Sequence, residues 1–252
     1  MIYGLYLSAQ GAAIQSLRQD VIANNLANAS TNTFKRDMVR AQAHNPFDFK
    51  QSAASMFPAH GGLKNLPGGV TPLDVATDFS PATFTATKQP LDLALAERGF
   101  FQVTDGKQTW LTRNGQFTIN EKQQLVTRDH GLKVLITTGT PFGGLDQSVP
   151  LEIMPDGTVM QAGDNFGKLA VVEPVAYPQL QKTGNNLYTT QGRVLPAKVV
   201  DVKSGYLEAS GVKPMVEMVE LIESERALES NVNMIKYQDD SLGKLLASLP
   251  PK

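Results

Sequence analysis

Apolar side chains recur at helical spacing near the start of the chain. The stripe consists of Ile14, Leu17, Val21, Ile22 and Leu26. Residues three, four and seven apart lie on one face of a helix, so this spacing predicts an amphipathic helix from about Leu5 to Asn28. The polar run from Asn28 to Thr33 favours turns and marks the predicted end of that helix.

The C-terminal region repeats its apolar residues more strictly. Its main track contains Leu221, Leu228, Ile235, Leu242 and Leu249, spaced by seven residues. A second track, Met218, Glu225, Val232, Asp239 and Leu246, is apolar at three of five positions. This heptad pattern predicts a helix from about Val212 to Leu249, about 57 Å long. A helix of that length must pack on the N-terminal helix or on another chain, or else fold only when a partner arrives.

The centre of the chain has the turn chemistry of β structure. Short apolar runs between about residues 91 and 195 are separated by Asp105-Gly106, Asn114-Gly115 and Asp156-Gly157. These dipeptides favour the positive φ angles of tight hairpin turns, so they predict antiparallel strands. Residues 37–90 mix Ala, Gln, Gly and Pro without a sustained period, which predicts an extended linker with short strands.

These patterns together predict an α+β fold. A mainly-β central domain would carry long N- and C-terminal amphipathic helices that pair as a coiled-coil-like assembly layer. The predicted segments are an N-terminal assembly helix and turn at 1–36, a linker at 37–90, a central β domain at 91–204 and a C-terminal heptad helix at 205–252. A helix pair built from both termini could be offered to neighbouring copies, which suits assembly.

Composition excludes several functional classes. With 23 Lys and Arg against 24 Asp and Glu, the formal net charge is -1, so nucleic acid is not an expected partner. The chain has no cysteine, which removes disulfides, thiolate metal sites and cysteine nucleophiles. Its three histidines, His44, His60 and His130, lack metal-ligand spacing. We therefore expect no enzyme activity, no cofactor and no metal site.

The N-terminus lacks the features of a cleaved secretion signal. Its first positive charge is Arg18, and polar residues interrupt the apolar ones before it. No window reaches the roughly 18 to 20 apolar residues of a membrane span, so membrane insertion is not expected. If the protein leaves the cytoplasm, we expect a route that cleaves no signal peptide.

Several motifs resemble those of a known family. The run from Asp20 to Asn28, DVIANNLAN, followed by Phe34-Lys35-Arg36, resembles the N-terminal signature of bacterial flagellar rod and hook proteins. Further segments follow in the family's order: LDLAL at 91–95, GFFQV at 99–103, TRNGQF at 112–117, LVT at 125–127 and GYLEAS at 205–210. The short central region resembles the rod proteins better than the longer hook protein.

The resemblance implies a structural subunit of the basal-body rod, the shaft that crosses the periplasm. In the family the two terminal helices form the inner layer of a helical tube, and the β domain forms its outer layer. The implied partners are copies of the chain itself, other rod and hook axial proteins, the flagellar type III export apparatus and the surrounding basal-body rings. Export through that apparatus, without signal cleavage, would explain the N-terminus.

Three positions depart from the family pattern. Thr33 stands where the family usually has glycine, Gly211 where it usually has asparagine, and Leu228 where an aromatic residue is common. A threonine at positive φ is costly, so the turn at Thr33 is expected to differ in shape. The motifs do not decide between a proximal and a distal position in the rod.

The terminal helices supply the predicted assembly interface. Its residues are Ile14, Leu17, Val21, Ile22, Asn24, Asn25, Leu26, Asn28, Leu221, Arg226, Leu228, Ile235 and Leu242. Asn24, Asn25 and Asn28 can fix the register between subunits, or cap a helix within one chain. The leucine track can be buried within the subunit, between subunits, or both. Arg226 can pair with Glu223 or Glu229, although we favour another subunit.

A second function remains open. A secreted β-domain binding module, such as an adhesin with coiled-coil oligomerisation, would also explain a heptad helix beside a β centre. It gives the asparagine-rich N-terminal signature no role. The two functions differ in what the isolated central domain does, because an adhesin fragment would keep its ligand binding and a rod fragment would lose assembly.

Overall fold

The computed structural model describes residues 2–43, 70–146 and 148–247. The chain divides into two compact units. The helical unit comprises Met1–Ala27, Asp37–Thr77 and Lys213–Lys252, and the β unit comprises Asn28–Arg36 and Asp78–Val212. Each unit therefore joins segments that lie far apart in the sequence. Neither α-helix in the described part of the chain is long and apolar enough to cross a membrane.

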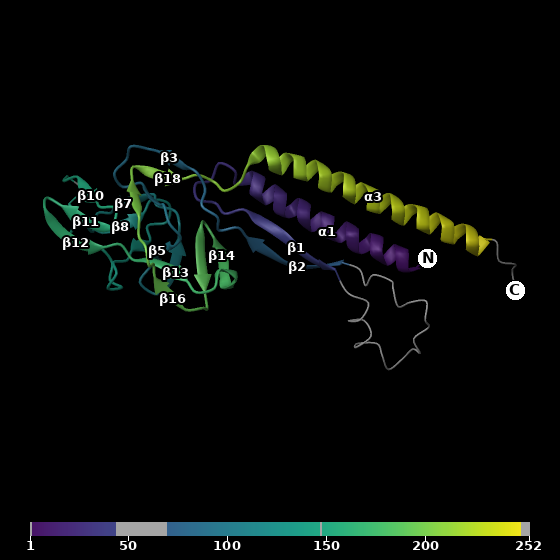
Figure 1. Ribbon diagram of the computed structural model, residues 1–252, viewed down its shortest axis with the longest axis horizontal. Coiled ribbons are helices and arrows are strands. Elements are labelled where there is room, and N and C mark those ends of the chain that lie inside the picture. Colours follow the sequence, from purple (N-terminus) through teal and green to yellow (C-terminus); the bar gives the residue numbers. More distant parts are fainter. Residues whose placement is uncertain (1, 44–69, 147, 248–252) are drawn as a thin grey trace. The chain divides into compact units, whose positions relative to one another are not determined.

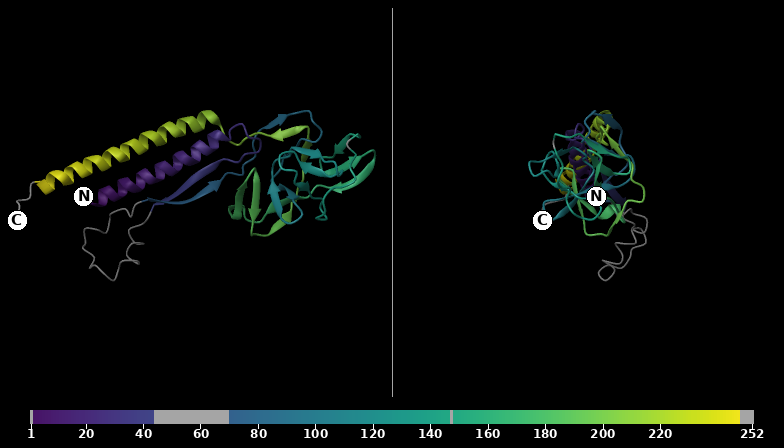
Figure 2. Two further views of the ribbon diagram at one scale, coloured as in Figure 1. Left: turned by 180° about the vertical axis from the view of Figure 1, so that it is seen from behind. Right: turned by 90° about the vertical axis from the view of Figure 1, so that its left-hand side faces the viewer.

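The helical unit contains α1 (Ile2–Ala27) and α3 (Pro214–Ala247), which run antiparallel, side by side (Figure 1 and Figure 2). Pro214 starts α3, where a proline removes no helical hydrogen bond. Glu217 in the first turn and Lys244 in the last turn suit the helix dipole. These two helices confirm the prediction of a long helix at each end.

A pair of strands lies along α1 in the same unit. β1 (Asp37–Ala43) pairs antiparallel with β2 (Val70–Thr77), with Asp37 opposite Thr77. The register shifts between Arg40 and Ala41, as in a β-bulge. Both strands fall in the segment for which the sequence predicts a linker with short strands.

The β unit is built around a nine-stranded sheet. Its strands are β5 (Phe100–Thr104), β6 (Thr109–Thr112), β7 (Phe117–Ile119), β8 (Leu125–Thr127), β9 (Lys133–Val134), β13 (Val171–Pro174), β14 (Leu180–Gly184), β15 (Leu187–Thr190) and β16 (Val194–Pro196). The main path runs β14-β15-β6-β5-β9-β8-β7, and β13 pairs with β5 and β16. A 3-10 helix, η2 (Tyr177–Gln179), precedes β14.

Smaller sheets complete the β unit. β10 (Leu151–Ile153), β11 (Thr158–Gln161) and β12 (Asp164–Lys168) form one of them. β4 (Leu93–Leu95) pairs with β17 (Val202–Ser204), and β3 (Phe84–Ala86) pairs with β18 (Tyr206–Glu208). Pairing within these sheets is antiparallel, which confirms the mainly-β centre.

Two of the three predicted hairpin turns are confirmed. Gly106, between the paired strands β5 and β6, has φ 97°, and Gly157, between β10 and β11, has φ 85°. The prediction for Asn114-Gly115 is wrong, because the flanking strands β6 and β7 are not neighbours in the sheet. Instead, a Cβ on Gly115 would lie 1.7 Å from the carbonyl oxygen of Leu93. Glycine is required there by the close approach of two backbone segments.

Neighbouring aromatic residues of β5 point to opposite faces of the sheet, as strand geometry requires. Phe101 lies in the main core, edge-on to Phe117, with the ring centroids 5.2 Å apart. Phe100 lies in a second cluster, 5.8 Å from Phe79 and 5.5 Å from Tyr188 between centroids. β5 is therefore buried on both faces.

The turn at Thr33 keeps a left-handed backbone despite its side chain. Thr33 has φ 60° and is buried in the β unit. Its backbone N–H donates to the carbonyl oxygen of Glu208 at 2.9 Å. A non-glycine residue in this conformation costs of the order of 1–3 kcal/mol, which the surrounding contacts must offset.

Candidate assembly interface

A line of polar contacts joins α1 and α3, and it includes the most deeply buried described side chains of α3, Glu217 and Ser224. Four pairs of residues form it, and we call this line the polar seam. The pairs are Gly4 with Gln238, Gly11 with Asn231, Gln15 with Ser224, and Asn25 with Glu217. On α3 the seam residues are spaced by seven, so they form a heptad track of their own.

Small residues of α1 face long amides of α3 along part of the seam. A Cβ on Gly4 would lie 2.8 Å from Nε2 of Gln238, and a Cβ on Gly11 would lie 2.9 Å from Oδ1 of Asn231. At the next pair the smaller residue is on α3 instead. Ser224 Oγ contacts the longer Gln15, at 3.1 Å from its carbonyl oxygen and 3.0 Å from its Oε1.

Asn25 joins three elements of the helical unit. Its side chain is fully buried, and its Oδ1 accepts from the Asp37 N–H at 3.0 Å at the start of β1. Its Nδ2 donates to the Asp37 carbonyl oxygen at 2.9 Å and to Oε2 of Glu217 at 3.2 Å. Asp37 Oδ1 accepts in turn from Thr77 Oγ1 at 2.6 Å. The end of α1, the start of α3 and the strand pair thus meet at one asparagine.

Replacing Asn25 by Asp is expected to destabilise the helical unit by about 3 kcal/mol or more, because a buried carboxylate would face Glu217 and the Asp37 carbonyl oxygen. The measurement is thermal unfolding followed by far-UV circular dichroism at the helix minimum. Asn24→Asp is the matched control, because the Asn24 side chain is exposed and a charge added there stays in contact with water. Equal midpoints for the two variants would contradict the role of Asn25.

The predicted interface residues occupy different environments. Ile22 and Asn25 are buried, while Asn24 and Arg226 are exposed. The others are partly buried: Ile14, Leu17, Val21, Leu26, Asn28, Leu221, Leu228, Ile235 and Leu242. On α3, Glu217 and Ser224 of the polar seam are therefore more deeply buried than the leucine track beside them. Contact of these residues with a second copy stays a prediction.

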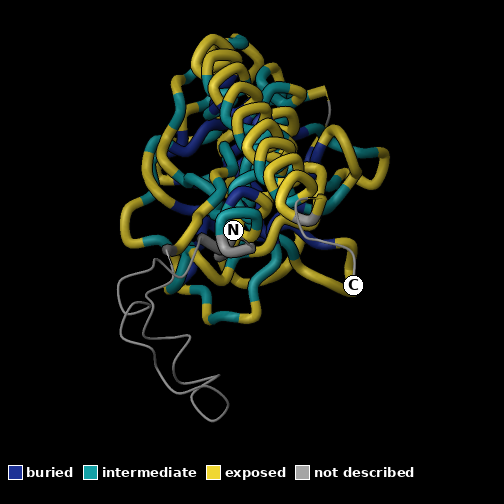
Figure 3. The backbone as a smooth tube through the Cα atoms, turned by 90° about the vertical axis from the view of Figure 1, so that its right-hand side faces the viewer, coloured by how far each residue is buried: buried dark blue, intermediate teal, exposed yellow. Residues whose placement is uncertain are grey.

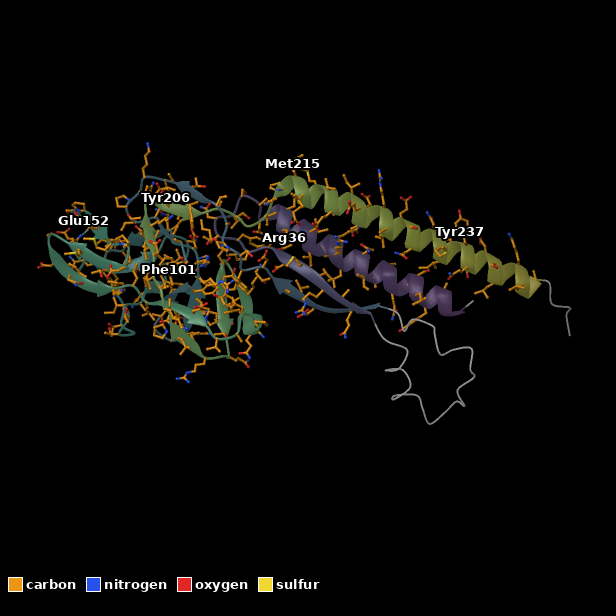
Figure 4. The ribbon with its side chains drawn as sticks, in the orientation of Figure 1. Arg36, Phe101, Glu152, Tyr206, Met215 and Tyr237 are labelled. Carbon is orange, nitrogen blue, oxygen red and sulfur yellow. The ribbon has the colours of Figure 1, made fainter. Side chains whose placement is uncertain are left out.

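The first turns of α3 carry their apolar side chains outward. Met215, Val216, Met218, Val219 and Ile222 are exposed, and we call them the outer apolar face. Met215 is 73% exposed and Ile222 51%, whereas Glu217 between them is 1% exposed. Figure 3 shows exposure along most of α3, and Figure 4 labels Met215 at its start. This distribution is the reverse of that in a helix that covers its own core.

A buried ion cluster fixes the segments of the β unit that lead into the two helices. Lys35 Nζ lies 2.7 Å from Oε1 of Glu208, and Arg113 Nη1 lies 3.2 Å from Oε2 of Glu208. Lys35 also donates to the Ser80 carbonyl oxygen at 2.7 Å. Burial lowers the pKa of the Lys35 amine, and the Glu208 carboxylate opposes that shift.

Backbone contacts strengthen the same junction within the β unit. Gly211 N–H donates to the Phe34 carbonyl oxygen at 2.8 Å, and Ser210 Oγ donates to the Asn28 carbonyl oxygen at 3.0 Å. Arg113 Nε donates to the Gly99 carbonyl oxygen at 2.9 Å. The segment after α1 and the segment before α3 are thus held together. Sequence reasoning noted the Phe34-Lys35-Arg36 motif but did not predict this cluster.

Family models match both ends and the centre of the chain. A model described as flagella basal body rod protein matches residues 5–35. The flagellar hook protein FlgE/F/G D1 domain matches residues 94–161. The flagellar basal body rod FlgEFG protein C-terminal model matches residues 203–249. The first match includes most of α1, and the third match includes all of α3.

Individual relatives agree with these matches. The chain is 33% identical to the flagellar basal-body rod protein FlgF of Caulobacter vibrioides, over 86% of this chain and 85% of the relative. It is 30% identical to the rod protein FlgG of Buchnera aphidicola, over 97% and 99%. It is 28% identical to FlgF of Escherichia coli, over 97% of both chains.

The matched family models and relatives are structural proteins of the flagellar rod and hook, and not enzymes. The chain belongs to the flagellar basal-body rod protein family. The adhesin alternative is not favoured, since relatives that match nearly the whole chain are rod proteins.

Proposed function

We propose that this chain is a structural subunit of the flagellar basal-body rod and polymerises through α1 and α3 into the tubular drive shaft. The observation that carries the proposal is the burial pattern in the first turns of α3. The acidic Glu217 is buried there, and the outer apolar face is exposed. An exposed apolar face of this kind is typical of a surface that another protein covers. Head-to-tail contacts that do not close into a ring generate a filament.

The partners follow from this function. They are further copies of the chain and other rod or hook axial proteins, which would cover the outer apolar face. Arg226 and Asn24 are exposed and join it as proposed contacts. The β unit would form the outer layer of the tube, next to the surrounding basal-body rings. Delivery to the periplasmic rod would use the flagellar type III export apparatus without signal cleavage.

The experiment is to locate the chain in the cell. Hook-basal bodies purified from cells that produce an epitope-tagged chain should contain it in the rod, and deletion of its gene should abolish hooks and swimming. An untagged chain supplied from a plasmid should restore both. Intact flagella in the deletion strain, with the tagged chain on the cell surface, would instead support the adhesin.

A further inference from the structure

Three of the four pairs of the polar seam match a small residue with a larger one, and this match favours one axial position of the two helices. Long Gln238 lies over Gly4, and Asn231 lies over Gly11. At the next pair the short residue is on α3, where Ser224 contacts Gln15. At these three pairs, a small residue on one helix therefore faces a larger residue on the other, and the fourth pair, Asn25 with Glu217, is joined by a hydrogen bond.

A slip of the helices by one heptad would break this match. In one direction Ser224 would come opposite Gly11 and leave a void, while Glu217 would lose Asn25. In the other direction Asn231 would meet the bulk of Gln15 or Arg18. A buried amide or carboxylate without its partner is destabilising, because it has left water and gained no hydrogen bond in exchange. A uniform apolar seam would tolerate the same slip far better, because leucines spaced by seven are equivalent.

The seam is not arranged for the greatest stability. Gln238 Oε1 is buried without a hydrogen-bond partner, although leucine at that position would carry no such polar atom. Polar residues at the buried positions of paired helices are known to specify register at some cost in stability. The half-buried leucine track beside the seam supplies apolar contact but no register.

We propose that the polar seam is a register lock, which fixes the axial position and rotation of α3 on α1 and so directs the outer apolar face away from α1. The residues that position α3 are Asn25, Gln15, Gly11 and Gly4 with their four partners on α3. This inference concerns contacts within one chain, so it does not depend on the proposed rod function, although rod assembly would use the face that it exposes.

Introduced cysteines can measure the register, because the full chain has none of its own. Gly4→Cys with Gln238→Cys reports the observed register, and Gly11→Cys with Gln238→Cys reports a slip of one heptad. That slip moves the helices by about 10 Å, beyond the reach of a disulfide. Under mild oxidation of the dilute full-length protein, the first pair should form its intramolecular disulfide about tenfold faster, the ratio that corresponds to one mismatched polar pair. Equal rates would overturn the proposal.

The second part of the experiment removes two polar residues of the seam on α3 and keeps both helices. Ser224→Leu with Asn231→Leu, added to each cysteine pair, should lower the ratio of the two rates from about tenfold to about threefold. The leucines make no polar distinction between registers, whereas the remaining pair of Asn25 with Glu217 still does. Glu223→Leu with Ser230→Leu is the matched control, because these exposed residues directly precede Ser224 and Asn231 in the sequence. This control should keep the tenfold ratio. Circular dichroism must show equal helix content. An unchanged ratio in the seam variant would overturn the lock, whereas failure of rod assembly with a correct ratio would count only against the proposed function.

Discussion

Replacing Glu208 by Gln is expected to lower the free energy of unfolding of the β unit by about 3–5 kcal/mol. Glu208 is the acceptor shared by Lys35 and Arg113, and all three side chains are buried. Without its charge, two cations stay close together in a region that water does not reach. The Ala82 N–H, which donates to Oε1 of Glu208 at 2.9 Å, would also lose a charged acceptor.

Urea unfolding followed by tryptophan fluorescence measures this loss. Trp110 is the only tryptophan of the chain, and it packs partly buried against the main core of the β unit. Lys168→Gln is the control, because Lys168 pairs with Asp156 at 3.6 Å in a largely exposed position. An exposed pair contributes less than about 1 kcal/mol. Equal urea midpoints for the two variants would contradict the role assigned to Glu208.

A double variant separates charge from packing. Lys35→Met combined with Glu208→Gln removes one cation together with the anion, so it should be less destabilised than the sum of the single variants. Arg113 would keep its bonds to the carbonyl oxygens of Gly99 and Glu97. If the effects of Lys35→Met and Glu208→Gln simply added, the two side chains would not act as a pair.

The sequence predicted the elements better than their contacts. Apolar periods located α1 and α3, and Asp-Gly dipeptides located two hairpins, because both signals are local. Asn114-Gly115 carries the same turn signal, yet Gly115 serves a close approach to Leu93, which is distant in the sequence. A local pattern cannot distinguish these two uses of glycine.

The heptad period identified the correct helix but not the polar heptad track that is more deeply buried within the single chain. Leu221 and Leu228 are spaced by seven, but so are Glu217 and Ser224, and the structure buries the polar pair more deeply. Polar residues spaced by seven were therefore visible in the sequence, but a search for apolar periods does not detect them. The hydrogen-bond partners of Asn25 and Lys35 could not be predicted from local sequence patterns, because Glu217 lies 192 residues from Asn25 and Glu208 lies 173 residues from Lys35.

The other large effect is expected on the outer apolar face. Val219→Asp or Ile222→Asp should abolish rod assembly and swimming, because a charge without a partner, once buried in an interface, costs several kcal/mol. Both side chains are exposed in the single chain, so the thermal midpoint of the purified protein should hardly change. The measurements are swimming in soft agar and electron microscopy of purified hook-basal bodies, beside circular dichroism of the monomer.

Two further variants show whether the effect belongs to the face or to charge in general. Ser230→Asp adds the same charge at another exposed position of α3, outside the outer apolar face, and should leave swimming intact. Leu228→Asp should impair both assembly and the monomer's thermal midpoint, because Leu228 is already partly buried beside the polar seam. Normal swimming of both outer-face variants would mean that Met215 to Ile222 stay uncovered in the rod, and that subunits meet through other surfaces of the terminal helices.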